Sequence, residues 1–447
     1  MNRTSVQTLD LLRRFESRGV TFIEPGHTWP IVWERARGVH VWDVEGKRYL
    51  DLTAAFGVAA AGHANARVVQ AGQRQMATLL HAMGDVHPHR LKAELARELS
   101  RITFERWTRP KSEVRSPKSE TGLAVGKVIF GNSGFEAVEA ALKTAMLATG
   151  RRGIVAFEGA YHGLGYGALN ATHRGFFRSP FRSQLAGIGH FLPFPEQPSG
   201  LERTLDQAQR HLRRRRVGAI LAEPIQGRGG IRIPPRGFLA GLRRVCDEHG
   251  ALLILDEIYT GFGRTGKWFA CEQESVVPDV ICLGKALTGG FPLSACVGRA
   301  DVMDAAWPAS TGEALHTSTF LGHPVGCAMA LAQIGEIRRR RLVERSARLG
   351  RVLLGELEAV AGRARPIAAA RGLGLMVGLE VRRADGSPAT ATVLEVIRRM
   401  LHRGFVLLPE GEHSQVIALT PPLSIGERDL DRALAALGEV LREVGPP

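Results

Sequence analysis

A lysine and two neighbouring acids follow apolar stretches that are typical of buried β-strands. Lys285 comes two residues after the apolar run that ends at Leu283, and Asp256 and Glu257 directly follow the run 251–255. A lysine in a semi-apolar environment loses its proton more easily and can then attack a carbonyl carbon. An acid at a buried strand end needs a partner, because an unpaired buried charge is costly. These residues could supply an amine and a carboxylate to one site; a lysine that extends to the surface is the alternative.

Two turns could add a phosphate site and a stacking surface. At Gly131-Asn132-Ser133-Gly134 an apolar run ends and a helical pattern begins, so free backbone N–H groups would face one point, which suits a phosphate. Ser133 is equally typical of a helix N-cap, with Glu136 three residues later completing a capping box. Tyr161 and His162 are flanked by glycines, which let an aromatic ring lie flat against a ligand. An incidental aromatic residue in a glycine-rich loop is the alternative.

The four segments together suit one cofactor. Pyridoxal 5′-phosphate has a phosphate, an aromatic ring, a basic ring nitrogen and an aldehyde, which match the phosphate cradle, the stacking surface, the buried acid and the amine. Dinucleotide binding is disfavoured. The glycines at 261, 263 and 266 match GxGxxG, but they follow the acids and lead into Lys267-Trp268 instead of opening a helix.

The elements that must position these residues are short apolar runs that alternate with helical stretches. The runs are 127–130, 153–157, 218–223, 251–257 and 279–284. Continuous apolar strands separated by helices predict an α/β fold, with a mostly parallel sheet covered by helices on both faces. Ligands of such sheets bind beyond the carboxyl ends of the strands, where the four segments lie.

Smaller units are expected around this sheet. Residues 38–52 alternate in character about a Glu-Gly turn and predict a β-hairpin, and the charged stretch 106–126 predicts an exposed loop. A helix from about 325 to 340 precedes weaker strands near 374–381 and 404–408. This last pattern indicates a second, smaller α+β domain.

The composition bounds the class of protein and its partners. With 447 residues and a net charge of +15, the chain is long enough for two or three domains and basic enough to attract anions. The basic runs 213–216 and 338–341 lack interleaved aromatic residues, so solvated helix faces are favoured over nucleic-acid binding. The five cysteines are scattered without a metal-ligand pattern, and no apolar run is long enough for a membrane helix. We expect a cytoplasmic protein that binds no metal, nucleic acid or membrane.

The chain resembles the class III aminotransferases, which include ornithine, acetylornithine and 4-aminobutyrate aminotransferases and glutamate-1-semialdehyde aminomutase. The resemblance extends from about Gly38 to Leu430 and rests on the motifs GNSGFEAVEAALK, AYHG, EPIQG, LDEIYTGFGRTG, GKALTGG and HTSTFLGHP. It implies fold type I of the pyridoxal-phosphate enzymes. The large cofactor domain would then comprise 61–322, and both chain ends, 1–60 and 323–447, would form the smaller domain.

The resemblance implies roles for the cofactor residues. Lys285 would form the internal aldimine, and Asp256 would pair with the pyridine nitrogen and keep it protonated, which makes the ring an electron sink. Tyr161 would stack on the ring, and His162 would also contact the cofactor. Once freed by the substrate, the Lys285 amine would move the proton from the substrate Cα, and two half-reactions would give ping-pong kinetics.

The phosphate would be held by two subunits. Ser133 and Gly134 would bind it from one subunit, and Thr319, in HTSTF, would reach the phosphate of the neighbouring subunit. The resemblance therefore implies an obligate homodimer with shared active sites.

The sequence departs from the family where the substrate would bind. Ala418 stands before the PPL motif where many relatives have a carboxylate-binding arginine, and Arg228 follows EPIQG where they have a glutamate. We predict that Arg228 binds a substrate carboxylate through its planar guanidinium fork. The alternative is that Arg228 pairs with a local acid such as Glu223 or points to solvent. Phe56 is a further candidate for substrate contact.

The leading hypothesis is an aminotransferase that takes the amino group of an ω-amino acid or amine and passes it to a 2-oxo acid. An aminomutase or a racemase on the same scaffold is the first alternative, and it would need no second substrate. A basic nucleic-acid-binding protein that keeps the fold without catalysis is the second alternative. It would be colourless and would bind with an affinity that falls steeply with salt.

Overall fold

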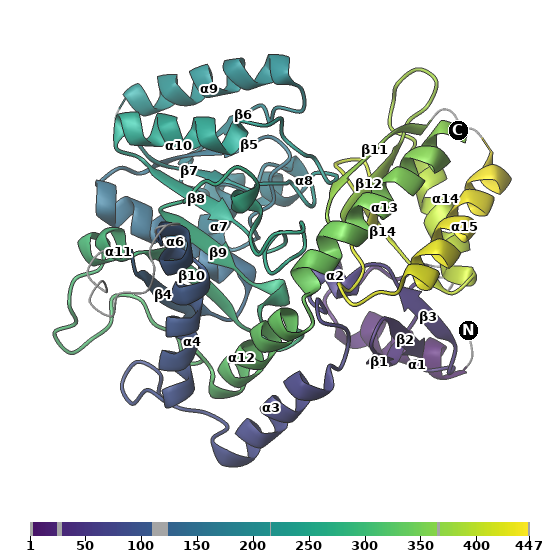
Figure 1. Ribbon diagram of the computed structural model, residues 1–447, viewed down its shortest axis with the longest axis horizontal. Helices are drawn as coiled ribbons and strands as arrows, with labels where there is room; N and C mark the ends of the chain where they lie inside the picture. The colour runs from purple at the N-terminus through teal and green to yellow at the C-terminus, as the bar shows by residue number, and fades with distance from the viewer. Residues whose placement is uncertain (1–2, 25–28, 110–123, 215, 364–366, 446–447) are drawn as a thin grey trace.

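The computed structural model describes residues 3–24, 29–109, 124–214, 216–363 and 367–445 (Figure 1). Its centre is a seven-stranded sheet with the order β4-β10-β9-β8-β7-β5-β6. The strands are β4 (Gly126–Gly131), β5 (Gly153–Phe157), β6 (Gly189–Leu192), β7 (Val217–Ala222), β8 (Leu252–Asp256), β9 (Val280–Leu283) and β10 (Ser294–Arg299). Only β10 runs antiparallel to its neighbours in this sheet. The predicted mostly parallel α/β sheet is confirmed.

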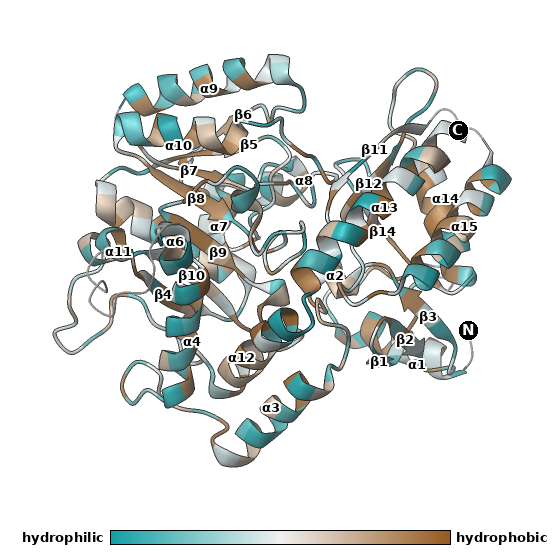
Figure 2. Ribbon diagram, viewed as in Figure 1, coloured by the Kyte–Doolittle hydropathy of each residue, from teal (hydrophilic) through white to brown (hydrophobic). Residues whose placement is uncertain are grey.

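The strands of this sheet are apolar throughout because both of their faces are buried. Successive residues enter different cores: Ile220 packs into the main core, and its neighbour Leu221 packs against the helix α6 (Gly134–Thr149). The other face is covered by α4 (Arg90–Ile102), α9 (Pro198–Arg213) and α10 (Phe238–His249). Figure 2 shows the apolar strands between helices whose outward faces are polar.

Two four-stranded sheets lie beside the large one. The first joins β1 (Trp33–Arg37), β2 (His40–Asp43), β3 (Arg48–Asp51) and β13 (Phe405–Val406); β2 and β3 form the predicted hairpin. The second has the order β11 (Ile367–Leu373), β12 (Met376–Val381), β15 (Val416–Leu419) and β14 (Leu408–Glu410). Because β13 pairs with β3, segments from both ends of the sequence meet in one sheet, as fold type I requires.

Helices surround the small sheets and connect them to the large one. Those on the small-sheet side are α1 (Arg3–Phe15), α13 (Leu342–Arg363), α14 (Thr390–His402) and α15 (Glu427–Val444), all on the right of Figure 1. The remaining α-helices are α2 (Ala54–Gly57), α3 (Ala66–Thr78), α5 (Phe104–Thr108), α7 (Tyr166–Leu169), α8 (Gly175–Arg178), α11 (Ala300–Ala306) and α12 (Pro324–Arg339). Among the described residues, 3₁₀ turns occur at η1 (Ser179–Gln184), η2 (Ala270–Gln273) and η3 (Lys285–Leu287). Across the described ranges, every helix is too short or too polar to span a lipid bilayer.

The bounds of several predicted elements differ from those in the structure. The loop predicted from residue 106 begins later, because α5 continues to Thr108, and residues 110–123 of that loop lie outside the described part of the chain. The helix expected from about 325 is α12, which starts one residue earlier because proline fits the first turn of a helix. Strands β1, β6, β10, β11 and β15 were not predicted. The domain boundaries at 60/61 and 322/323 remain a prediction.

Candidate active site

A cavity of about 350 Å³ opens beyond the carboxyl ends of β8 and β9. Six of the predicted site residues line it: Gly134, Tyr161, His162, Arg228, Asp256 and Lys285. They lie at or beyond the ends of five strands of the large sheet: β4, β5, β7, β8 and β9. Parallel strands bring these ends to one edge, so residues far apart in the sequence face one space.

Lys285 lies directly beyond β9, at the start of η3. Its φ angle of +35° is in the left-handed region, which is unfavourable for a residue with a side chain and is tolerated mainly at functional sites. Burial lowers the pKa of the amine, an effect that nearby Asp256 and Glu223 oppose. The Nζ atom is 4.7 Å from the centre of the Tyr259 ring. A buried amine with a lowered pKa is suited to nucleophilic attack on a carbonyl carbon.

Asp256 is held by its neighbours at the end of β8. Its Oδ2 atom lies 2.8 Å from Nδ1 of His162, and its Oδ1 accepts a hydrogen bond of 3.1 Å from the backbone N–H of Ile258. His162 is buried, and its second ring nitrogen, Nε2, has no hydrogen-bond partner among the described residues. The histidine therefore fixes the orientation of the carboxylate within the cavity.

Glu257 faces away from the cavity, although it is adjacent to Asp256 in the sequence. Its carboxylate accepts hydrogen bonds from the Thr260 hydroxyl at 2.6 Å and from the backbone N–H groups of Ala270 and Cys271, both at 2.8 Å. Burial raises its pKa to about 7. Successive residues of a strand point to opposite faces, so only Asp256 reaches the cavity.

The turn before α6 favours the phosphate interpretation of Ser133. The Ser133 side chain makes no capping hydrogen bond, so the capping-box alternative is wrong. Glu136 instead accepts hydrogen bonds from the backbone and side-chain N–H groups of Asn132. The Oγ atom of Ser133 is buried without a hydrogen-bond partner in the described ranges. An unpaired buried hydroxyl at a helix N-terminus fits a bound phosphate, and with the amine of Lys285 and the acid Asp256 it fits pyridoxal phosphate.

The Tyr161 loop depends on a glycine. Gly163 has a φ of +108°, and a Cβ atom there would lie 2.3 Å from the Cβ of Phe135. The backbone N–H of Tyr161 donates to Glu223 at 3.0 Å, and the Tyr161 ring meets Phe177 edge to face at 5.6 Å. This arrangement fixes the position of the ring at the cavity wall; whether it stacks on a ligand stays a prediction.

Two acids near the cavity were not predicted as site residues. Glu223 follows β7 and accepts hydrogen bonds of 3.0 Å from the backbone N–H groups of Tyr161 and Gly227. Burial raises the pKa of both Glu223 and Glu410 to about 7. Glu223 carries the same signal as Asp256, an acid directly after an apolar strand. Glu410, in β14, has no such signal.

Arg228 lines the cavity and pairs with Glu410 through a 3.5 Å contact between Nε and Oε2. Arg228 does pair with an acid, as the alternative interpretation predicted, but this acid lies in the second small sheet and is not Glu223. Ala418, in β15 opposite Leu408, is buried. The charges at this wall are therefore an arginine from the large-sheet side and a glutamate from the small-sheet side.

Three predicted site residues do not line the cavity. Ser133 lies directly before Gly134, which does. Phe56, in α2, is 49% exposed and has a left-handed φ of +60°. Thr319 lies in an exposed stretch before α12. The proposed roles of Phe56 and Thr319 stay predictions.

Comparison with known proteins agrees with this geometry. Residues 22–441 match the model of the family described as aminotransferase class-III. The chain is 38% identical to an acetylornithine aminotransferase of Methanopyrus kandleri, over 93% of this chain and 96% of that protein. It is 34% identical to the 5-aminovalerate aminotransferase DavT of Pseudomonas aeruginosa, over 99% and 100%.

Solved structures show the same fold over the whole chain. An amine transaminase from an uncultivated Pseudomonas species, in its pyridoxal-phosphate-bound form, has a TM-score of 0.85 at 27% identity, covering 97% of this chain and 99% of that one. An aminotransferase of Bacillus anthracis has a TM-score of 0.87 at 25% identity, covering 99% and 100%. The chain therefore belongs to the class III aminotransferases, a family of pyridoxal-phosphate-dependent enzymes.

Proposed function

We propose that this aminotransferase moves the amino group of an ω-amino acid or amine to a 2-oxo acid. One observation carries the proposal: the buried amine of Lys285 shares a cavity with the histidine-held Asp256 and with Arg228. The two relatives named above support the substrate class. One is named for acetylornithine and the other for 5-aminovalerate, whose amine and carboxylate lie at opposite ends of the molecule.

The residues of the cavity divide the work of holding the cofactor. Pyridoxal phosphate, when bound, supplies an aldehyde for the amine and a ring that withdraws electrons from the substrate Cα–H bond. Lys285 would hold the aldehyde carbon, Asp256 the ring nitrogen, and Ser133 with Gly134 the phosphate. Tyr161 would lie against the ring.

The same residues would carry the proton and orient the substrate. The Lys285 amine, when free, would take the proton from the substrate Cα, because its lowered pKa favours the neutral form. Arg228 would bind the carboxylate of the oxo acid, the donor, or both, and Phe56 would contact the substrate from the exposed side.

Product analysis tests the reaction type. An aminotransferase consumes one equivalent of 2-oxo acid for each amino group removed, with parallel-line kinetics as expected for a ping-pong mechanism. Conversion of a single substrate without an acceptor would favour an aminomutase or a racemase. A purified protein with no absorbance above 300 nm after incubation with pyridoxal phosphate and removal of the unbound cofactor would contradict the proposal.

We also infer a homodimer with shared active sites and a cytoplasmic location. The five cysteines are free and buried, which suits a reducing compartment. Thr319 is exposed on its own subunit, where its hydroxyl is available to the phosphate site of a neighbour.

The Thr319→Ala substitution tests the shared site. Loss of one hydrogen bond to a charged phosphate should speed cofactor dissociation by about tenfold. Mixed dimers of Lys285→Ala and Thr319→Ala chains should contain one damaged and one intact phosphate site. The damaged site is the one in the Lys285→Ala chain, which would receive the substituted position 319 from its neighbour, and the intact site is the one in the Thr319→Ala chain, which would still receive Thr319 from its neighbour. An unchanged dissociation rate in Thr319→Ala would contradict a role for Thr319 at the phosphate.

A further inference from the structure

The contact between Arg228 and Glu410 is long for an ion pair that includes a buried carboxylate. The Glu410 side chain is 2% exposed and the Arg228 side chain 34% exposed, and their closest atoms are 3.5 Å apart. Across the described residues, neither Nε of Arg228 nor Oε2 of Glu410 makes a hydrogen bond. A carboxylate and a guanidinium that pair firmly approach to about 2.8 Å through two parallel hydrogen bonds. The two side chains are therefore close enough to attract each other but are not locked together.

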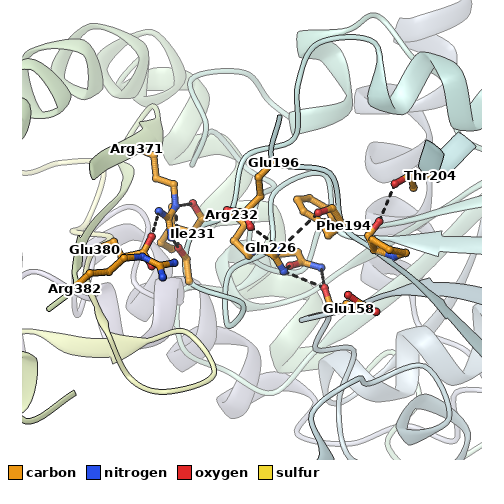
Figure 3. Close-up of polar contacts among 12 residues, drawn as sticks. Glu158, Phe194, Glu196, Thr204, Gln226, Ile231, Arg232, Arg371, Glu380 and Arg382 are labelled. Atoms are coloured by element: carbon orange, nitrogen blue, oxygen red, sulfur yellow. Dashed lines mark hydrogen bonds and ion pairs between the residues drawn. The ribbon is translucent and has the colours of Figure 1, made fainter. Parts of the chain in front are cut away.

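The backbone that carries Arg228 is, by contrast, fixed from two sides (Figure 3). On the large-sheet side, the amide of Gln226 donates to the backbone carbonyl of Glu158 at 2.9 Å. On the small-sheet side, Nε of Arg371 donates to the carbonyl of Ile231 at 2.9 Å. The loop 226–232 is thus held at both ends, and movement at this wall is left to side chains.

The backbone of Glu410 is anchored to the same loop. The N–H of its neighbour Gly411 donates to the carbonyl of Arg228 at 3.2 Å. Glu410 itself pairs with Val416 across the second small sheet. The backbone positions that carry the two charged side chains are therefore fixed relative to each other.

Cations outnumber acids around Glu410. Glu410 is surrounded by the cations Arg228, Lys285 and Arg174 and by one acid, Glu223. Burial raises the pKa of Glu410 to about 7, so an anionic Glu410 is costly unless a cation stays beside it. A substrate ammonium that takes the place of Arg228 would keep a cation beside this carboxylate.

We propose that Glu410 is a specificity-determining residue, which binds the distal ammonium group of a diamine donor when Arg228 turns aside. Arg228 keeps the complementary role toward a substrate carboxylate. One wall of the cavity then accepts either charge at the far end of the substrate. The inference rests on the proposed amine-transferring function and adds a class of donor, aliphatic diamines.

The test compares three donors with chains of the same length: 1,5-diaminopentane, 1-aminopentane and 5-aminopentanoate. The donor half-reaction of the holoenzyme is followed by the absorbance of the cofactor, without an acceptor. Glu410→Gln should raise the half-saturating concentration of the diamine by roughly 10- to 100-fold, the effect of losing a charged hydrogen bond. The value for 1-aminopentane should not change, and the value for 5-aminopentanoate should stay the same or fall.

Two further variants serve as a control and as a second test of the proposal. Glu412→Gln removes an exposed acid two residues away and should leave all three donors unaffected. Arg228→Gln frees Glu410 and should lower the half-saturating concentration of the diamine while raising that of 5-aminopentanoate. This second variant tests the proposal even where Glu410→Gln does not fold.

Binding without turnover gives an independent measurement. The tertiary diamine 1,5-bis(dimethylamino)pentane is charged but cannot react, and calorimetric titration should show weaker binding to Glu410→Gln than to the unsubstituted protein. Equal effects on diamine and monoamine, or an increase confined to 5-aminopentanoate, would overturn the proposal and leave Glu410 as a positioning residue for Arg228. If the unsubstituted protein converts 1-aminopentane but shows no preference for the diamine, this inference fails alone. If it converts no amine with any acceptor, the proposed function fails.

Discussion

The two ends of the cavity are built in different ways. At the cofactor end, Lys285, Asp256 and Ser133 each follow a strand of the same sheet, and their positions follow from that sheet. At the substrate end, Arg228 comes from a loop after β7 and Glu410 comes from β14 of a separate sheet. The cofactor end therefore depends on one rigid element, whereas the substrate end depends on how two sheets meet. Substitutions at the first should abolish the chemistry, and substitutions at the second should change which substrate is used.

The largest effect is expected at Lys285. Lys285→Ala should remove the absorbance band of lysine-bound cofactor and abolish turnover, because no other lysine lines the cavity formed by the described residues. Visible spectra and a standard transamination assay measure both. Lys267→Ala, at an exposed position that does not line the cavity, is the matched control and should behave like the unsubstituted protein. Full activity of Lys285→Ala would refute the assignment.

The second-largest effect is expected at Asp256, and it distinguishes Asp256 from the adjacent Glu257. Asp256→Asn should leave the cofactor bound but slow Cα deprotonation by orders of magnitude, because a neutral amide cannot keep the ring nitrogen protonated. A primary kinetic isotope effect with a donor deuterated at the carbon that bears the transferred amino group would report this step. Glu257→Gln should spare the rate, since Glu257 binds Thr260, Ala270 and Cys271 outside the cavity. The reverse pattern would assign the ring nitrogen to Glu257.

The third effect belongs to the substrate end. Arg228→Leu should raise KM for carboxylate substrates by roughly 10- to 100-fold, the loss of a charged pair of about 1.5–3 kcal/mol, and should spare a monoamine that has no carboxylate. Steady-state kinetics with the two donor types measure this difference. Equal losses for both would make Arg228 a structural residue and would remove the contrast between the two ends.

The smallest effect concerns stability. Burial raises the pKa of Glu257 from 4.5 to about 7, so between these pH values the folded chain keeps a proton that the unfolded chain has released. The free energy of unfolding should therefore fall as the pH rises from about 5 to 7, and part of this slope should be lost in Glu257→Gln. Urea unfolding across this range measures it. Glu358→Gln, on the exposed face of α13, should keep the full slope; an identical slope in Glu257→Gln would contradict the expectation.

Most of the cofactor end could be predicted because its signals are local. Apolar strands with Lys285 and Asp256 at their ends indicate a parallel sheet, and parallel strands place their carboxyl ends at one edge. Strands β6, β10 and β11 were missed because glycine, alanine or polar residues interrupt their apolar pattern, and β15 was missed although Val416–Leu419 is apolar throughout. The competing interpretations of Ser133 could not be separated either, since a capping serine and a phosphate-binding serine occupy the same position before a helix.

The sequence by itself determined the family and the cofactor and predicted the lysine, because these depend on residue types at fixed distances from strand ends. Only the tertiary structure decided that Asp256 is held by His162, that Ser133 Oγ is left unpaired, and that Glu257 points elsewhere. It also decided the partner of Arg228. Glu410 is a single acid in a short strand, distant in sequence, and the attraction between two charges depends on their separation in space and on their burial, neither of which a linear pattern contains.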